Sequence, residues 1–311
     1  MFYDLIIIGG GPAGAAAGVY AARKKLKTLL LTPDFGGQSA VSPDIHNWIG
    51  TKSIAGNDLA QALEAHVRSY EDENFIVKTG PAGRVTGLTK TDTGFTVRSE
   101  SGEFFETKTV LLAAGSNRRK LEVPGAADYD QKGLTYCATC DGPLFADQDV
   151  AVIGGGNAGF ETAAQLLAYC RSVTLLHKNT DYNKADKITV EKVLSHTNMT
   201  GILNAEILAV TGDKFVTGLT YKNKTTGEVK DLPVTGIFVE IGFVPNTLLA
   251  KDVVEMNAYG AIKIDSKNQQ TTTPGVWAAG DCTDALYHQN NIAAGDAVKA
   301  VEDIYNWLHL K

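Results

Sequence analysis

The sequence has few cysteines and no long apolar run, and both absences narrow its class. Four cysteines among 311 residues are too few for the disulfide scaffold of a small secreted protein. No apolar stretch reaches the roughly 20 residues that a membrane-spanning helix needs. No basic segment with a cleavable apolar run precedes the first strand. We therefore expect a cytoplasmic protein that has no signal peptide and does not engage a membrane.

An excess of positive charge is also lacking. The 29 Lys and Arg residues against 35 Asp and Glu give a formal net charge of -6, which argues against a nucleic acid or an anionic membrane as partner. Low-complexity segments are absent. At 311 residues the chain is longer than one core usually supports, so we expect two domains.

What the sequence does contain is one pattern repeated. In each copy an apolar strand runs into a glycine-rich loop, which is followed by a helix and a second strand. The expected segments are 4–8, 9–14 (GGGPAG), 15–24 and 27–31 in the first copy, and 149–153, 154–159 (GGGNAG), 160–169 and 172–176 in the second. A glycine loop in this context is typical of a dinucleotide-binding βαβ unit.

The remaining elements indicate how the two copies are combined. The expected elements are a helix over 58–70, an antiparallel meander over 75–101, buried strands over 110–115 and 275–281, and a helix over 292–308. The late strand resembles the closing element of the first domain, so the second domain is predicted to be inserted into it. We predict an α/β fold of two Rossmann-like, three-layer domains. Their expected bounds are 1–117, 118–246 (the inserted domain) and 247–311.

The first glycine loop predicts a phosphate site. Gly9 permits a tight turn, Gly11 lets the backbone approach a pyrophosphate, and Gly14 lets the helix pack closely on the strand. The N-terminus of the helix then stabilises phosphate charge.

Residues farther along favour a flavin at this loop. Asp34 comes late after its strand, which weakens the case for an ordinary ribose contact. Gly37 and Gln38 offer close backbone approach and an amide, as a flat polar ring needs. The carboxylate of Asp281 can accept a hydrogen bond from a ribitol hydroxyl. We therefore expect FAD in the discontinuous domain.

The second loop predicts a nicotinamide nucleotide in the inserted domain. After its strand come His177, Lys178 and Asn179, where an acid would bind a ribose 2′-hydroxyl and an arginine would clasp a 2′-phosphate. Lys178 and Lys184 offer point charges without the bidentate fork of arginine. NADH and NADPH both remain open. The residues expected to bind this nucleotide are Gly154, Gly156, Asn157, Gly159, His177 and Lys178.

Cys137 and Cys140 predict a redox-active disulfide. Disulfide exchange needs an attacking sulfur, a resolving sulfur and a proton source, and Asp141 directly follows the pair. A half-built zinc site and a purely structural disulfide are the alternatives. No second CxxC or CxxH is present and the histidines show no metal-ligand spacing, so we expect no metal. Cys170 and Cys282 are expected to be small buried hydrophobes.

Together these segments resemble the low-molecular-weight thioredoxin reductase family, class II of the FAD-dependent pyridine nucleotide-disulfide oxidoreductases. The matching segments cover nearly the whole chain, in the order IIIGGGPAG, FGGQ, NWIG, LLAAGS, YCATCDGPLF, VAVIGGGNAG, IFVEIGFVPNT and WAAGDC. The resemblance implies a homodimer with FAD in the discontinuous domain and a nicotinamide nucleotide in the inserted one. It also implies two alternating domain orientations.

The resemblance further implies individual roles. Cys140 would face the flavin, Cys137 would attack the external disulfide, and Asp141 would donate the proton. The FAD contacts that we expect are Gly9, Gly11, Pro12, Ala13, Gly14, Gly37, Gln38, Asn47, Ala114, Gly115, Asp281, Gln289 and Asn290.

The chain departs from the family where NADPH-using members carry arginines. Those positions hold Lys178, Asn179 and Asn183, and His288 stands in place of the arginine in an Arg-Gln pair. The runs 141–145, 184–186 and 237–247 are similar to the reductase part of the alkyl hydroperoxide reductase flavoprotein, which prefers NADH. Some relatives without the arginines take electrons from ferredoxin or act as dithiol oxidases.

We therefore expect a thioredoxin reductase-like flavoenzyme. It would pass electrons from NADPH or NADH, through FAD and the Cys137–Cys140 disulfide, to a thioredoxin- or glutaredoxin-like protein. The alternative keeps the fold and the disulfide chemistry but uses ferredoxin, or works as a dithiol oxidase, without a nicotinamide nucleotide. A third hypothesis is a flavin-binding redox sensor whose disulfide only reports its state.

Overall fold

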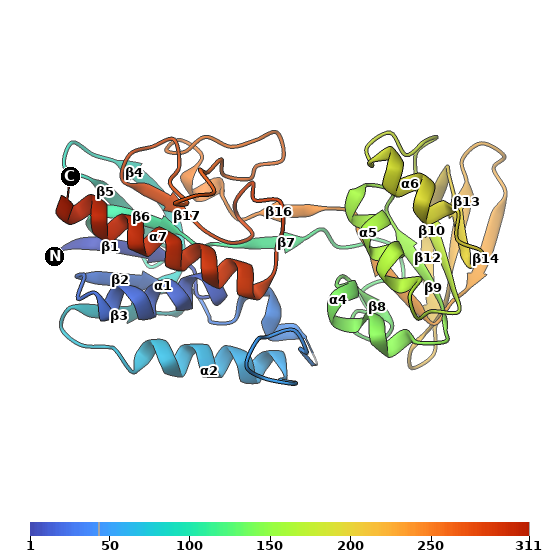
Figure 1. Cartoon of the computed structure of the whole chain (residues 1–311), viewed down its shortest axis with the longest axis horizontal. Helices are drawn as coiled ribbons and strands as arrows, with labels where there is room; N and C mark the ends of the chain where they lie inside the picture. Colours follow the sequence, from blue (N-terminus) through green and yellow to red (C-terminus); the bar gives the residue numbers. More distant parts are fainter. Residues whose placement is uncertain (43, 311) are drawn as a thin grey trace. The chain divides into compact units, whose positions relative to one another are not determined.

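The computed structural model describes residues 1–42 and 44–310, and its chain divides into two compact units (Figure 1). Unit 1 comprises Met1–Asn117 and Val244–Lys311, and unit 2 comprises Arg118–Phe243. The chain passes between the units through strands β7 (Ser116–Arg118) and β16 (Phe243–Pro245), which pair with each other. The predicted second crossing lies slightly later, after residue 246. Lys311, the last residue of that predicted segment, lies outside the described residues.

Unit 1 is built on a mainly parallel sheet, in which β1 pairs with β2 on one side and β6 on the other. In the described residues its order is β3-β2-β1-β6-β5-β4, with β17 also pairing with β6. The strands are β1 (Phe2–Ile8), β2 (Thr28–Leu31), β3 (Phe75–Lys78), β4 (Val85–Lys90), β5 (Phe95–Ser99), β6 (Phe104–Leu112) and β17 (Val276–Ala278). Residues 104–107 of β6 pair antiparallel with β5, residues 106–112 pair parallel with β1, and residues 110–112 pair parallel with β17.

Alternating side chains of β1 supply both faces of this sheet, because successive residues of a strand point to opposite sides. Leu5 and Ile7 belong to the apolar core on one face, and Ile6 and Ile8 to the core on the other. The first face is covered by α1 and α7, which lie side by side (Figure 1). The helices and short helical turns of unit 1 are α1 (Pro12–Arg23), η1 (Gly37–Val41), α2 (Gly56–Arg68), α3 (Gly80–Gly83), η3 (Leu248–Ala250) and α7 (Asn290–Leu310).

Small residues set the close approach of α1 to its neighbours. The helix buries Ala13, Ala15, Ala17 and Ala21, and the neighbouring helix α7 also buries alanines. A Cβ added to Gly18 would lie 3.1 Å from the Leu30 side chain and 3.2 Å from that of Phe75. Helix α1 therefore packs closely on the sheet.

Unit 2 repeats the architecture with a different outer layer. Its parallel sheet has the order β11-β10-β9-β15-β8, and β12, β13 and β14 form a separate antiparallel sheet. The strands are β8 (Leu134–Thr135), β9 (Asp149–Ile153), β10 (Ser172–Leu176), β11 (Met199–Ile202), β12 (Ala205–Gly212), β13 (Val216–Asn223), β14 (Val229–Pro233) and β15 (Gly236–Val239). The helices are α4 (Ala138–Asp141), η2 (Gly142–Phe145), α5 (Asn157–Leu166) and α6 (Lys187–Leu194).

Strand alternation again explains the layers of unit 2. Val150 and Val152 pack with the α5 and α6 side chains, whereas Ala151 and Ile153 pack toward β12 and β13. Three layers result, with helices on one face and an antiparallel sheet on the other. In the described residues, no helix combines the length and apolar character that crossing a membrane requires.

The architecture agrees with the predicted α/β fold, with local differences. The segment predicted as one antiparallel meander begins with Phe75–Lys78, which instead pairs parallel with β2 as β3; its alternation looks the same in either kind of strand. The antiparallel sheet of β12 to β14 is not among the predicted elements. Helices α1 and α5 begin earlier than predicted, because the glycine loops run directly into them.

Candidate functional site

The glycine loop of unit 1 leaves space at one position and is filled at the others. Gly9 has φ +121°, and a Cβ there would overlap the carbonyl of Ala113, so only glycine fits. A Cβ on Gly14 would overlap the carbonyl oxygen of Gly9. Gly11 differs, because its nearest neighbour would be the Gly37 Cα at 4.0 Å.

Gly11 therefore opens a cradle at the N-terminus of α1, facing the turn at Gly36 and Gly37. Gly11 is the N-cap residue, Pro12 follows it, and the first turn of the helix carries no acidic residue. The free N–H groups and the helix dipole favour a phosphate at such a position. The residues present thus fit a pyrophosphate group.

Side chains predicted to bind FAD meet beside this cradle. The Gln38 amide donates from Nε2 to Oδ2 of Asp281 at 3.3 Å and to the Ser116 hydroxyl at 3.2 Å. His288 lies with Nδ1 3.6 Å from Oδ1 of Asp281. Its Nε2 is 2.8 Å from the carbonyl oxygen of Ala285, which can only accept a hydrogen bond. A polar cluster with both donors and acceptors results.

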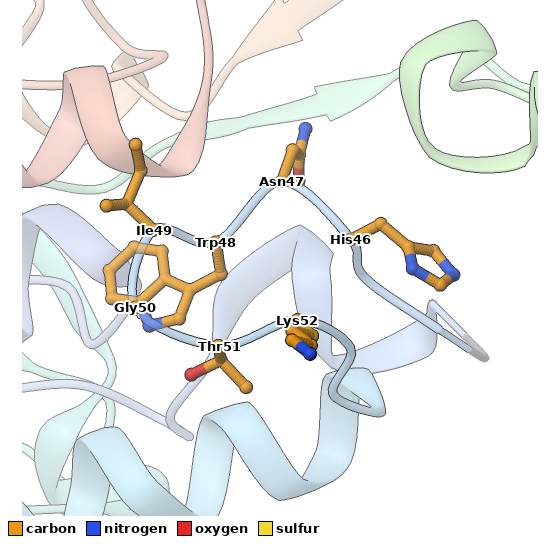
Figure 2. Close-up of a pocket in the computed structure, with 7 residues that line it drawn as sticks. All are labelled: His46, Asn47, Trp48, Ile49, Gly50, Thr51 and Lys52. Carbon is orange, nitrogen blue, oxygen red and sulfur yellow. The ribbon is translucent and has the colours of Figure 1, made fainter.

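The loop of residues 46–52 is tied to the start of α7 and lines a pocket of its own (Figure 2). Asn47 donates from Nδ2 to Oε1 of Gln289 at 3.1 Å. Asn291 donates to the Asn47 carbonyl at 2.7 Å, and the hydroxyl of Ser39 donates to Oδ1 of Asn290 at 2.8 Å. Residues separated by more than 240 positions are thereby brought together.

Two predicted FAD contacts, Ala114 and Gly115, follow β6 at the same edge of the sheet. Asn246 donates from Nδ2 to the Ala114 carbonyl and from its backbone N–H to that of Gly115, each at 3.0 Å. A Cβ on Gly115 would meet nothing within 4 Å. Unit 1 thus gathers the glycine loop, Gln38, Asp281 and the start of α7 at the carboxyl ends of its parallel strands.

The glycine loop of unit 2 repeats the geometry of the first. Gly154 has φ +125°, and a Cβ on Gly159 would overlap the carbonyl of Gly154. Gly156 is the N-cap of α5, and a Cβ there would meet nothing within 4 Å. The side-chain oxygen of Asn157 accepts a hydrogen bond at 2.8 Å from the backbone N–H of Asp186, the residue that caps α6. This second cradle also fits a pyrophosphate.

His177 supports this loop from beneath. Its Nδ1 accepts a hydrogen bond from the Gly155 N–H at 3.0 Å, and its ring is buried beside Tyr182. Burial lowers the pKa of the imidazole, Asp181 opposes this effect, and the nearby charges of Lys178 and Lys184 lower the pKa further. Because Nδ1 accepts the hydrogen bond from Gly155, it carries no proton in this arrangement. Lys178 itself is exposed, and its carbonyl accepts a hydrogen bond from Lys224.

Cys137 and Cys140 are joined by a disulfide at the start of α4, with their Cα atoms 5.3 Å apart. The Cys140 N–H lies 3.2 Å from Sγ of Cys137. Asp141 is buried directly beyond, and its Oδ2 accepts a hydrogen bond from the Thr135 hydroxyl. Burial raises the pKa of Asp141, against the opposing effects of Thr135 and Arg118. A buried carboxyl group with a raised pKa therefore sits beside the disulfide.

The other two cysteines are buried and reduced, as predicted. Burial raises the pKa of both Cys170 and Cys282 to about 11, so neither is a reactive thiolate at neutral pH. Across the described residues, His, Cys, Asp and Glu side chains do not gather in groups of three that could hold a metal ion.

Comparison with known proteins decides the family. The model of the pyridine nucleotide-disulphide oxidoreductases matches residues 3–301. The chain belongs to that family. It is 41% identical over 311 residues to an alkyl hydroperoxide reductase protein of Escherichia coli (strain K12), and 40% identical over 306 residues to "NADH dehydrogenase" of Bacillus subtilis (strain 168). Each match spans 98% of this chain but only 58% of the relative.

Among solved structures, the pyridine nucleotide-disulphide oxidoreductase fold of this chain is shared by thioredoxin reductase from Streptococcus pyogenes. The TM-score is 0.88 at 32% identity, covering 100% of this chain and 99% of that one. This confirms the predicted fold class and family. Membership makes the chain an oxidoreductase, and it implies FAD and a pyridine nucleotide as cofactors.

Several residues of these sites were not predicted from the sequence. Thr135 and Asn291 bind predicted residues directly, and Thr162 and Arg118 contact the buried carboxyl of Glu240. Threonine and asparagine carry no local signal for such roles, because their partners are distant in sequence. Glu240 had one usable signal, since it directly follows an otherwise apolar strand.

Proposed function

We propose that this pyridine nucleotide-disulphide oxidoreductase is a dithiol–disulfide reductase that uses FAD and a reduced nicotinamide nucleotide. The observation that carries the proposal is the Cys137–Cys140 disulfide, with the buried carboxyl of Asp141 beside it. A disulfide with a built-in proton donor is suited to exchange rather than to stapling a fold. The two open glycine cradles in the same chain would hold the FAD and the nucleotide that supply the electrons.

Unit 1 is the proposed FAD-binding unit. The N–H groups at Gly11 and Ala13 would hold the pyrophosphate, while Gln38, Asn47 and Asp281 would bind the ribitol and ring. The contacts predicted at Gly9, Pro12, Gly14, Gly37, Ala114, Gly115, Gln289 and Asn290 belong to the same proposal. Bound FAD would supply two-electron chemistry, taking a hydride from the nucleotide and reducing the disulfide.

Unit 2 is the proposed nucleotide-binding unit. Gly154, Gly156 and Gly159 shape its cradle, and Asn157 and Lys178 lie at its edge. We assign His177 a supporting role, because its Nδ1 is engaged by the Gly155 N–H. Unit 2 therefore carries both the hydride donor and the disulfide.

The disulfide chemistry follows from the residues around it. Two electrons and two protons convert the Cys137–Cys140 bond into two thiols. Asp141 takes the proton of the Cys137 thiol, and the resulting thiolate attacks one sulfur of the partner's disulfide and breaks its S–S bond. The leaving partner sulfur takes that proton from Asp141. The Cys140 thiol then gives up its proton and attacks Sγ of Cys137, which restores the intramolecular disulfide; the partner's second sulfur is released and takes that proton. Thr135 holds one oxygen of Asp141, leaving the other to carry the proton.

The proposed substrate is a thioredoxin- or glutaredoxin-like protein disulfide. The structural likeness to thioredoxin reductases supports this substrate. The names of the longer relatives support a peroxide-reducing system as the destination of the electrons. We further propose a homodimer working in the cytoplasm, where a dithiol of this kind stays reduced between turnovers.

A second candidate changes only the donor. The residues directly after β10, His177, Lys178 and Asn179, include neither an acid nor an arginine, and His177 is engaged by the Gly155 N–H. This favours a ferredoxin donor, or a dithiol oxidase, over a strongly selective NAD(P)H enzyme.

An anaerobic titration separates the two candidates. The FAD-loaded protein is mixed with NADH and with NADPH in separate experiments, and the flavin absorbance is followed. Bleaching by either nucleotide, followed by reduction of added thioredoxin, supports the first candidate. If neither nucleotide bleaches the flavin while dithionite-reduced ferredoxin does, the second is correct. Bleaching without any disulfide reduction would contradict both.

A further inference from the structure

Glu240 stands at the mouth of the unit 2 cradle although its residue type is costly there. It directly follows β15, its N–H donates to the Ile153 carbonyl at 2.8 Å, and its own carbonyl packs against Gly154. Its side chain is only 9% exposed. A buried carboxyl group loses hydration, and an apolar residue would usually be more stable in such a place. Its presence points to a ligand.

Strand order places this residue on a particular side of the cradle. β9 lies between β10 and β15 in the order β11-β10-β9-β15-β8. The chain leaves β9 toward β10 and returns to β15 much later, so the strand order reverses between β9 and β15. Dinucleotides bind across the carboxyl ends of the strands at such a switch point, with the adenosine ribose at the end of the second strand, here β10. The nicotinamide half then lies toward β15.

The carboxyl group is held by one oxygen. Thr162 on α5 donates to Oε1 at 3.0 Å, and Nη1 of Arg118 lies 3.7 Å from the same Oε1. Burial raises the pKa of Glu240, the charge of Arg118 and the hydrogen bond from Thr162 oppose this, and the charge of Glu161 raises the pKa further. Both contacts thus fix the carboxyl group through Oε1, and neither of them involves Oε2.

We infer that Glu240 is a binding residue for the nicotinamide riboside half of the nucleotide, with Oε2 as the hydrogen-bond acceptor. This inference rests on the proposed function, in which unit 2 binds a nicotinamide nucleotide. The adenosine end is bound elsewhere, at Gly156 and beyond β10. Glu240 therefore contributes to the affinity for the whole dinucleotide and not to that for its adenosine diphosphate part.

Calorimetric titration of the FAD-loaded protein with ADP, NAD⁺ and NADP⁺ tests this division. In Glu240→Gln the amide oxygen keeps the place of Oε1, while an NH₂ group replaces the acceptor Oε2. We expect the dissociation constant of whichever dinucleotide binds to rise by about 10- to 100-fold, the effect of losing a hydrogen bond to a charged group. ADP binding should change less than twofold. Glu206→Gln, an exposed acid on β12, is the matched control and should change neither.

Equal weakening of ADP and dinucleotide, or no weakening of either, overturns the inference. Glu240→Asp retains the carboxyl group but shortens the side chain by one methylene, so it should also weaken binding of the dinucleotide alone. It replaces the glutamine variant in the test if that variant is not stably folded. A wild-type protein that binds none of the three ligands refutes the proposed nucleotide donor itself. A wild type that binds them, with Glu240→Gln unchanged, refutes only the role of Glu240.

Discussion

The hydroxyl of Thr135 donates a hydrogen bond to Oδ2 of Asp141, which joins the end of β8 to the residue that follows the disulfide. This contact fixes the orientation of a carboxyl group whose pKa is raised by burial. Asp141→Asn keeps the size and the acceptor oxygen but cannot deliver a proton. We expect the rate of thioredoxin reduction to fall by about 10²- to 10⁴-fold. Stopped-flow measurement should find flavin reduction by the nucleotide unaffected; a fall in both rates would contradict the role.

The same burial predicts a pH-dependent stability difference for Asp141→Asn. A carboxyl with a raised pKa favours the folded state when protonated, and that contribution is lost as pH rises through its folded value. The wild type therefore loses stability as pH rises above 3.8, whereas the asparagine variant does not, so at pH 7 the variant should melt at the higher temperature. Below the ordinary carboxyl pKa of 3.8 the two should converge. Calorimetric melting at several pH values checks the sign, and a variant that melts lower at pH 7 would refute it.

Cys137 and Cys140 are expected to be required for disulfide reduction but not for FAD binding. Replacing Cys137 or Cys140 by serine should leave FAD bound, because the flavin site is assigned to unit 1, and should abolish thioredoxin reduction completely. Absorbance spectra report the flavin and an insulin-coupled assay reports turnover. Cys170→Ser is the matched control, since that thiol is buried away from the exchange chemistry. Retained turnover in either variant would exclude a dithiol mechanism.

The glycines offer a selective test of both cradles. A Cβ meets nothing nearer than 4.0 Å at Gly11 and nothing within 4 Å at Gly156, and neither has positive φ. Alanine at these positions should therefore fold, yet crowd a pyrophosphate. We expect Gly11→Ala to lower FAD occupancy at least about tenfold while ADP binding is retained. Gly156→Ala should instead weaken ADP binding at least about tenfold while FAD stays bound.

Gly14→Ala is the contrasting variant for this pair. Its Cβ would overlap the carbonyl oxygen of Gly9, so the helix must move off the strand and the fold itself should suffer. Far-UV circular dichroism and thermal melting distinguish the two classes. Normal FAD and ADP affinities in both cradle variants would show that the ligands lie elsewhere.

Features that repeat locally could be predicted from the sequence, whereas features that depend on distant partners could not. The loops at Gly9 and Gly154 are read from spacing, because turn, phosphate approach and helix packing each require a glycine at a fixed offset. The pairing of Asn47 with Gln289 could only be implied by resemblance, since it depends on how α7 returns to the sheet. The parallel pairing of β3 was missed for the same reason.

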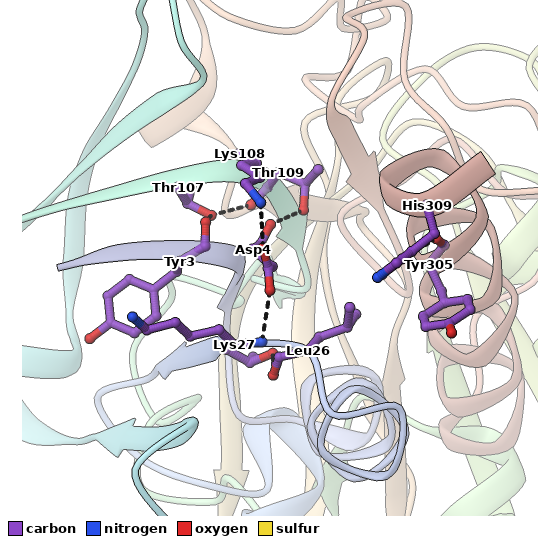
Figure 3. A network of polar contacts seen from close by, with 10 residues as sticks. Tyr3, Asp4, Leu26, Lys27, Thr107, Lys108, Thr109, Tyr305 and His309 are labelled. Carbon is purple, nitrogen blue, oxygen red and sulfur yellow. Dashed lines mark hydrogen bonds and ion pairs between the residues drawn. The ribbon is translucent and has the colours of Figure 1, made fainter. Parts of the chain in front are cut away.

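The polar network at the other end of β1 predicts how stability depends on pH (Figure 3). Asp4 accepts hydrogen bonds from Nζ of Lys108 at 2.8 Å and from the Lys27 N–H at 3.1 Å, and its backbone carbonyl accepts one from Thr109 at 2.6 Å. Burial works against ionisation of Asp4. The hydrogen bonds of Lys108 and Lys27, with the charges of Lys108 and His309, outweigh burial and lower its pKa.

A lowered carboxyl pKa stabilises the folded state above the ordinary value of 3.8, and this stabilisation is lost as pH falls through the folded value. Asp4→Asn should therefore lower the free energy of unfolding by about 1 kcal/mol at pH 7, given that the Lys108 pair is partly exposed. The difference should shrink as the solution is acidified below pH 3.8, where the wild-type carboxyl loses its charge too. Urea unfolding at pH 7 and in acid measures both values, with the exposed Glu106→Gln on β6 as control. A loss that is constant across this range would mean that Asp4 acts through its shape and not through its charge.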